Sequence, residues 1–111
     1  MSVAQAFALF CLLSGGNCIY DPAAHITTYW PAAGGINGSG DYTVTASGRE
    51  VEEGVTAACG PGIAFGTKVY VGWFDSWFTC WDRGSAIEDG EVDVMSKELV
   101  NVRGEVVWVI R

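Results

Sequence analysis

The chain has 111 residues, of which half are hydrophobic, with 15 glycines, 3 prolines and a formal net charge of −7. This length and composition predict one globular domain with a single modest core and exclude a disordered chain. The few lysines and arginines are scattered, so we expect no nucleic-acid partner. A neutral polymer such as a polysaccharide suits this charge balance better, and five tryptophans and four tyrosines offer rings on which sugars stack.

The N-terminal run VAQAFALFCLL (3–13) is uncharged and apolar but too short to span a bilayer, so we expect no stable membrane span. Together with the following SGGN, it resembles the hydrophobic region of a secretory signal with a cut near Gly16, although no basic residue precedes it. The alternative is an amphipathic or buried helix that stays on the chain. We therefore divide the chain into an N-terminal apolar segment, signal-like or docking, over 1–24, and a β domain over 25–111.

Four cysteines stand at positions 11, 18, 59 and 80. An even number in a small, glycine-rich domain predicts two disulfides, for which three pairings are possible. No CxxC pair is present and His25 is the sole histidine, so we expect no zinc site. No other metal or cofactor is expected.

Short segments rich in β-branched and aromatic residues predict strands. In chain order they are ITTYW (26–30), DYTVTAS (41–47), VTAAC (55–59), GTKVYVGW (66–73), WFTCW (77–81), EVDVMS (91–96) and GEVVWVI (104–110). The dipeptide at 75–76 predicts a hairpin, and SKELVNV (96–102) predicts a short helix with Ser96 as N-cap. Six or seven short strands and one helix predict a mainly β fold, a small and mostly antiparallel barrel.

The ordered motifs VTASG, VTAAC, IAFGTKVYV and CWDRGSAIEDGEVDVMS, within about 42–110, resemble the double-psi β-barrel lytic transglycosylases and their relatives. GTKVY and GSAI are similar to the three-aspartate domain, and TASG, TAA and DRG to the rare lipoprotein A domain. The resemblance implies a six-stranded double-psi β-barrel in which two psi loops cross and bring strand-end acids into one groove. On this resemblance Asp93 is the catalytic acid and Asp82 its partner, with Gly84 and Ser85 in the loop beside them.

Aromatic residues near the strand ends are candidates for sugar platforms. Tyr29 and Trp30 are substrate-binding candidates together with Gly84 and Ser85, and Trp73 and Trp77 are further aromatic candidates. For each ring the alternative is packing in the core or at its rim.

One position departs from the family pattern. An aspartate or histidine stands there in the family, and Cys59 stands there in this chain. A cysteine that is not a thiolate supplies neither charge nor a comparable hydrogen bond. The resemblance places Cys59 near Cys80, and a disulfide between them would brace the site.

The resemblance implies a peptidoglycan lytic transglycosylase that acts by aspartate general acid/base catalysis, in a secreted, periplasmic or cell-wall protein. Burial beside strand residues and the charge of Asp82 are expected to raise the pKa of Asp93 and keep its carboxyl protonated. One alternative is an expansin-like glycan-binding module without catalysis, and another is a structural part of a phage or cell-wall assembly. In a purely structural interpretation, Asp82 caps a turn and Asp93 bonds backbone amides.

Overall fold

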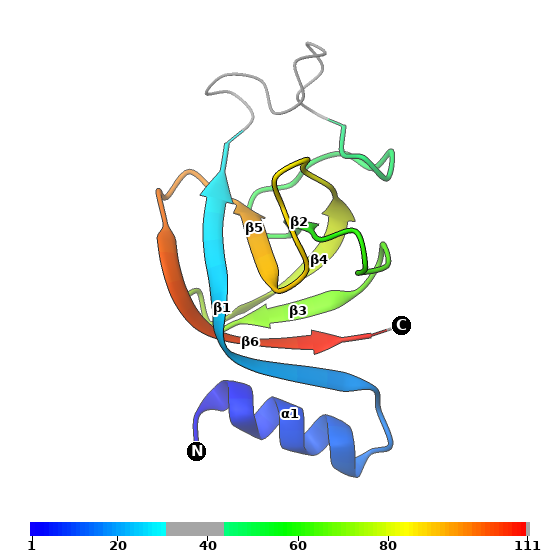
Figure 1. The fold of residues 1–111 in the computed structure, drawn as a ribbon, viewed down its shortest axis with the longest axis vertical. Helices are drawn as coiled ribbons and strands as arrows, with labels where there is room; N and C mark the ends of the chain where they lie inside the picture. The colour runs from blue at the N-terminus through cyan, green and yellow to red at the C-terminus, as the bar shows by residue number, and fades with distance from the viewer. Residues whose placement is uncertain (31–43, 111) are drawn as a thin grey trace.

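The computed structural model describes residues 1–30 and 44–110, which form a closed barrel of six strands with one helix against its side (Figure 1). The elements are α1 (Val3–Leu13), β1 (Cys18–Tyr29), β2 (Thr56–Cys59), β3 (Lys68–Val71), β4 (Ser76–Asp82), β5 (Glu91–Met95) and β6 (Asn101–Val109). The predicted mainly β fold, a six-stranded barrel with one short helix, is confirmed, but the helix is α1 and not the segment 96–102.

The strands follow the order β1-β5-β2-β4-β3-β6 around the barrel, and β6 closes back onto β1. The pairs β1–β5 and β2–β4 are parallel, and the other four pairs are antiparallel. Parallel neighbours cannot be joined by a hairpin and need a crossover connection. Two parallel pairs in an otherwise antiparallel barrel are in keeping with the double-psi arrangement expected from the motifs.

The long strand β1 bends in the middle and serves two parts of the barrel (Figure 1). Its register with β6 shifts between Asp21 and Ala24, around Pro22, which has no N–H to donate. The first half pairs with the end of β6, whereas the second half lies between β6 and β5. The expected division between residues 24 and 25 therefore falls inside one strand.

Alternate side chains of the strands fill the barrel interior. The fully buried members include Ile26, Val69, Val71, Val92, Val94 and Val106. Two buried cysteines of this interior, Cys59 on β2 and Cys80 on β4, form a disulfide. The second disulfide joins Cys11 at the end of α1 to Cys18 at the start of β1. The prediction of two disulfides is confirmed, as is the pairing implied by the resemblance.

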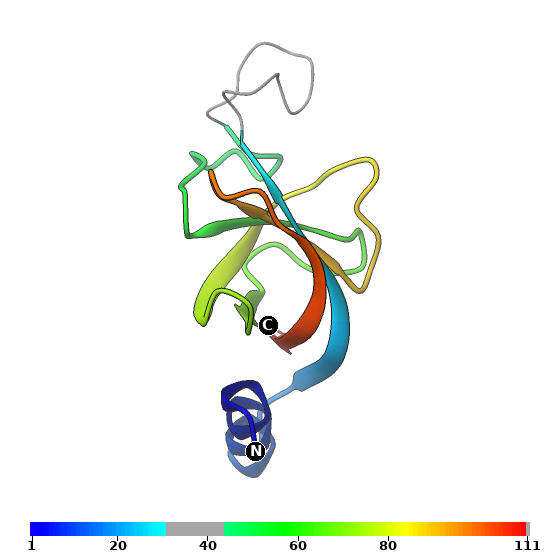
Figure 2. The same ribbon diagram turned by 90° about the vertical axis from the view of Figure 1, so that its left-hand side faces the viewer.

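Helix α1 lies outside the barrel, along β1 and β6 (Figures 1 and 2). Its N-terminus has a capping box in which Ser2 and Gln5 bond each other's backbone N–H groups. The small side chains Ala4 and Ala8 pack against Tyr70 of β3 and Val107 of β6. The segment that resembles a secretory signal is thus a docked helix in this structure. Among the described residues, no helix has the length and apolar character needed to cross a membrane.

Two predicted elements differ from the observed ones. The predicted helix over 96–102 is wrong, because the chain bends after Ser96 and enters β6 at Asn101. The predicted strand over 41–47 lies partly outside the described residues. In its described part, Val44 forms one isolated bridge with Glu50 and a turn follows.

The predicted hairpin is present between β3 and β4, which pair antiparallel. Asp75 in its turn has a φ of 48°. Aspartate is one of the few residues other than glycine that enters this left-handed region without large strain. The turn chemistry at 75–76 therefore agrees with the sequence prediction.

Candidate active site

The two aspartates singled out by the motifs lie on either side of one strand. In β2, Ala58 is the register partner of Asp82 on β4 and also of Asp93 on β5. Strand neighbours are about 4.8 Å apart, so the two aspartate Cα atoms are separated by roughly 10 Å. Val92 and Val94 point into the core, so alternation places the Asp93 side chain on the outer face of the barrel.

The position of Asp93 is fixed by β1. Thr27 is its register partner in the parallel β1–β5 pair, and the Thr27 hydroxyl donates a 2.9 Å hydrogen bond to Asp93 Oδ1. Burial raises the pKa of the Asp93 carboxyl, the Thr27 hydrogen bond opposes this rise, and the negative charge of Asp82 adds to it. A carboxyl with a raised pKa is the form of aspartate that can act as a general acid.

Asp82 is almost completely buried, with 6% of its surface exposed. Its Oδ1 accepts hydrogen bonds from the backbone N–H groups of Ala46 and Arg83, at 2.8 and 2.9 Å. Its Oδ2 accepts a 3.1 Å hydrogen bond from the hydroxyl of Tyr29. Three donors converge on this side chain, so Asp82 ties β4, the end of β1 and the segment around Ala46 together.

Tyr29 enters the site through its hydroxyl group. Burial raises the pKa of this phenol, and the neighbouring charge of Asp82 raises it further, as does that of Asp93. The phenol is therefore neutral and remains a hydrogen-bond donor to Asp82. In the structure, the Tyr29 hydroxyl contacts Asp82, one of the two acids. The ring of Tyr29 remains a candidate platform for a sugar.

A second set of polar side chains lies on the same outer face of the barrel, beside Asp93. His25 lies two residues before Thr27 on β1, and its ring nitrogens contact Glu91 Oε2 at 3.0 Å and Asn101 Oδ1 at 2.7 Å. The hydrogen bond with Asn101 raises the pKa of His25, and the one with Glu91 raises it further. From the sequence, His25 was considered only as a possible zinc ligand. The i, i+2 spacing of His25, Thr27 and Tyr29 along β1 is the signal that would have placed these three side chains on one face of the strand.

For the other predicted site residues, Gly84, Ser85 and Trp30, the structure describes no contact with either acid. Gly84 is half-buried and its carbonyl accepts a hydrogen bond from Ile87 N–H, whereas Ser85 is exposed in that turn. Trp30 follows β1, and the ammonium group of Lys97 lies 5.0 Å from the centre of its ring.

Trp77 belongs to a different part of the molecule. Its ring centre lies 5.1 Å from that of Phe7 on α1 and 5.4 Å from that of Tyr70. The acid pair lies on β4 and β5, on either side of β2, whereas this aromatic cluster lies under the helix. For Trp77 the structure thus shows the packing arrangement that was the alternative to a sugar platform. Trp73 is exposed in the β3–β4 turn, whose Gly72 and Asp75 line a pocket with Ser2 at the start of α1.

The sequence also suggests that three acids around the turn before β5, Glu88, Asp89 and Glu91, are solvated surface; Glu88 and Asp89 are exposed, whereas Glu91 is half-buried. Asp89 Oδ1 accepts a 2.9 Å hydrogen bond from the N–H of Gly62, and a Cβ on Gly60 would lie 2.3 Å from that oxygen. Glu91 contacts His25, whereas Glu88 is exposed as expected.

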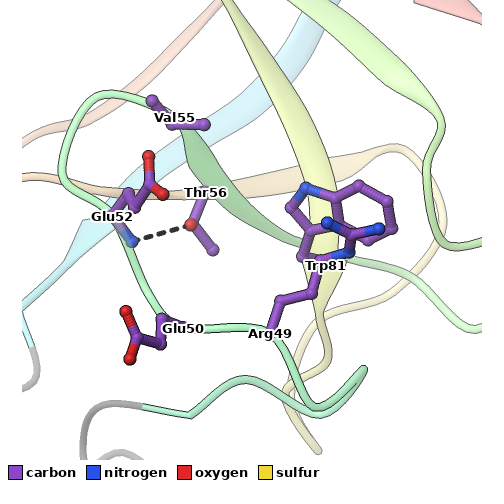
Figure 3. A pocket seen from close by; sticks show the side chains of 6 residues that line it. All are labelled: Arg49, Glu50, Glu52, Val55, Thr56 and Trp81. Atoms are coloured by element: carbon purple, nitrogen blue, oxygen red, sulfur yellow. Dashed lines mark hydrogen bonds between the residues drawn. The ribbon is translucent and has the colours of Figure 1, made fainter.

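A pocket of about 300 Å³ opens between the start of β2, the segment before it and Trp81 of β4 (Figure 3). Its walls are Arg49, Glu50, Glu52, Val55, Thr56 and Trp81. The Arg49 guanidinium lies 3.8 Å from the centre of the Trp81 ring. Sequence reasoning did not assign these residues to the site.

No family model, no curated protein and no solved structure matches this chain. Within residues 1–30 and 44–110, no group of three or more histidines, cysteines or acids is placed to hold a metal ion.

Proposed function

We propose that the chain is a glycan-cleaving domain, a peptidoglycan lytic transglycosylase in which Asp93 is the general acid and base. The observation that supports this most is the placing of Asp93 and Asp82 on either side of Ala58, with burial raising the pKa of Asp93. Cleavage of a glycosidic bond needs a carboxyl that protonates the leaving oxygen and a second group that stabilises the oxocarbenium-like transition state.

In this proposal the protonated Asp93 gives its proton to the glycosidic oxygen as the C–O bond breaks. The hydroxyl on C6 of the muramyl sugar then attacks the anomeric carbon and returns a proton to Asp93, which leaves a 1,6-anhydro sugar. Asp82 is the fixed negative charge that favours the cationic transition state. Tyr29 and the two backbone N–H groups hold Asp82 in place.

The proposal includes an extracytoplasmic location, secreted, periplasmic or cell-wall associated. Both disulfides support it, because such bonds persist in oxidising compartments.

A second candidate is a glycan-binding module without catalysis, of the expansin type. The specific observation in its favour is that Cys59, at the third family position, is fully buried in a disulfide. It therefore contributes no charged or titrating group to the outer face. The full set of donors around Asp82 also suits a structural role.

One experiment separates these candidates. Purified sacculi are incubated with the protein, their turbidity is followed, and the soluble products are identified by mass spectrometry. Anhydro-muropeptides support the transglycosylase, and products with reducing ends indicate a hydrolase. Protein that sediments with sacculi and releases no product would refute the enzymatic proposal and favour the binding module.

A further inference from the structure

We infer that the pocket in Figure 3 is a subsite for one uncharged pyranose unit of a glycan, with the ring of Trp81 as its platform. This inference rests on the proposed function for its ligand class, and it adds a site that the motifs do not assign. Its volume of about 300 Å³ is at the small end of the range for ligand sites, which suits one ring better than a longer segment.

The pocket adjoins the acid pair on the same face of the barrel. Thr56 lines the pocket, and Ala58, between the two aspartates, lies two residues further along β2. Residues i and i+2 of a strand share one face and lie about 6.6 Å apart. On the neighbouring strand, Trp81 directly precedes Asp82. A glycan that passes the acids would therefore extend into the pocket.

A bulge in β4 makes this neighbourhood possible. Ala57 pairs with Cys80, but Ala58 pairs with Asp82, so Trp81 is the extra residue between them. A bulge re-aims the side chains next to it. In this case Trp81 lines the pocket while its neighbour Asp82 keeps its place in the acid pair.

The walls of the pocket suit a sugar. Trp81 is half-buried and provides an apolar ring, and the lining also has three exposed polar side chains, those of Arg49, Glu50 and Glu52. Pockets that bind small molecules combine an apolar surface with a small number of polar groups. The Arg49 guanidinium covers the Trp81 ring in this structure. Because an exposed cation–π contact is weak, a sugar can replace it, and the guanidinium is then free to bond hydroxyl groups.

The charged side chains of the pocket favour an uncharged sugar over an anionic one. The pocket has two carboxylates and one guanidinium, and the whole chain has a net charge of −7. A uronic acid would face repulsion from Glu50 and Glu52 with only Arg49 as a partner, whereas the hydroxyl and amide groups of a neutral ring can bond both kinds of side chain.

The test is a titration with tri-N-acetylchitotriose, in an Asp93→Asn background so that no cleavage occurs. We expect saturable binding, with shifts of the backbone amides over 49–56 and of the Trp81 indole in nitrogen–proton NMR spectra.

Trp81→Leu in the same background should weaken binding at least tenfold. Phe10→Leu, which removes an exposed ring on α1, is the control and should bind as the parent does. Trigalacturonate should bind at least tenfold more weakly than the neutral trimer.

Several outcomes would overturn the subsite: shifts confined to other residues, equal affinity of folded Trp81→Leu, equal affinity for trigalacturonate, or no binding at 10 mM trimer, roughly the weakest affinity worth assigning. The NMR shifts are measured without a substitution in the pocket. They therefore test the subsite even if the Trp81→Leu protein does not fold. Failure of the proposed function looks different: the wild-type protein would release no product from sacculi while Trp81-dependent binding of the trimer persists. Cleavage of sacculi without Trp81-dependent binding of the trimer would contradict the subsite but not the proposed enzymatic activity.

Discussion

The hydroxyl of Thr27 donates a 2.9 Å hydrogen bond to Asp93 across the parallel β1–β5 pair. This bond holds the carboxyl on the outer face of the barrel, where burial raises its pKa. Asp93→Asn preserves the shape and the acceptor oxygen but removes the proton that the proposed mechanism transfers. We expect glycan cleavage to fall by at least ~100-fold, the usual scale of general acid catalysis, as measured by the rate of product release from sacculi.

The control for this variant is Glu88→Gln, which removes a carboxylate from the exposed turn before β5. It should cleave within about twofold of the wild type, since exposed substitutions away from the site have small effects. If Asp93→Asn is folded and cleaves as fast as the wild type, Asp93 is not the general acid.

The raised pKa of Asp93 also links folding stability to pH. A group whose pKa is higher in the folded state contributes stability below its ordinary pKa, and this contribution is lost as pH rises through the folded value. We therefore expect the unfolding free energy of the wild type, relative to Asp93→Asn, to fall between pH 3.5 and pH 7. Urea denaturation of both proteins at the two pH values measures this difference, and a difference that is constant or grows with pH would contradict it.

Much of the barrel could be predicted because β-branched and aromatic residues are concentrated in its short strands. Val92 and Val94 flank Asp93, and residues of these kinds make up most of 68–71 and 104–109. The N-terminal half of β1 was missed, because Pro22 and Asp21 interrupt its pattern where the strand bends.

The false helix over 96–102 has a local cause. Ser96 Oγ does accept a hydrogen bond from the N–H of Glu98, as an N-cap-like residue can, but this closes only a local turn. Pairing of Asn101 and Val102 with β1 then extends β6. Tertiary pairing outweighs the helical spacing there, because a short helix has little stability of its own.

The candidate site was predictable in part. The motifs point to Asp82 and Asp93, and the register shows that Ala58 lies between them. Thr27 and the pocket beside Trp81 depend on which strands become neighbours and on a bulge. A single sequence does not give either of these.

The Cys59–Cys80 disulfide joins neighbouring strands directly beside the acid pair. By the chain-entropy model, a loop of this length contributes roughly 3 kcal/mol to the unfolding free energy. We expect the Cys59→Ala/Cys80→Ala double variant to lose stability of about this size in urea denaturation. The observed pairing predicts one peptide that contains both cysteines in non-reducing maps of the wild type. Free thiols at both positions in oxidised protein would contradict the pairing.

Docking of α1 depends on small residues at its contact with the barrel. Ala4 is 2% exposed and packs against Tyr70 and Val107. Ala4→Arg forces a long charged side chain into this contact, and overpacking of this kind costs about 1–3 kcal/mol. We expect faster proteolysis within residues 1–13 and a change in the fluorescence of Trp77, which contacts Phe7. Leu12→Arg, at a position 62% exposed, is the matched control and should change neither.

The Cys11–Cys18 disulfide ties α1 to β1 across the site near Gly16 where a secretory cut was considered. A cut there before the disulfide forms would remove Cys11 and leave Cys18 unpaired, and it would uncover Tyr70 and Val107. Because burial of this apolar surface favours the docked helix, we expect the mature protein to retain residues 1–16.

The measurement is the intact mass of protein secreted by its native host, under non-reducing and reducing conditions. A gain of about 4 Da on reduction, two hydrogen atoms for each disulfide, in a chain that contains α1 supports retention. A mature chain that starts near Asn17 would show that the docked helix is lost on export.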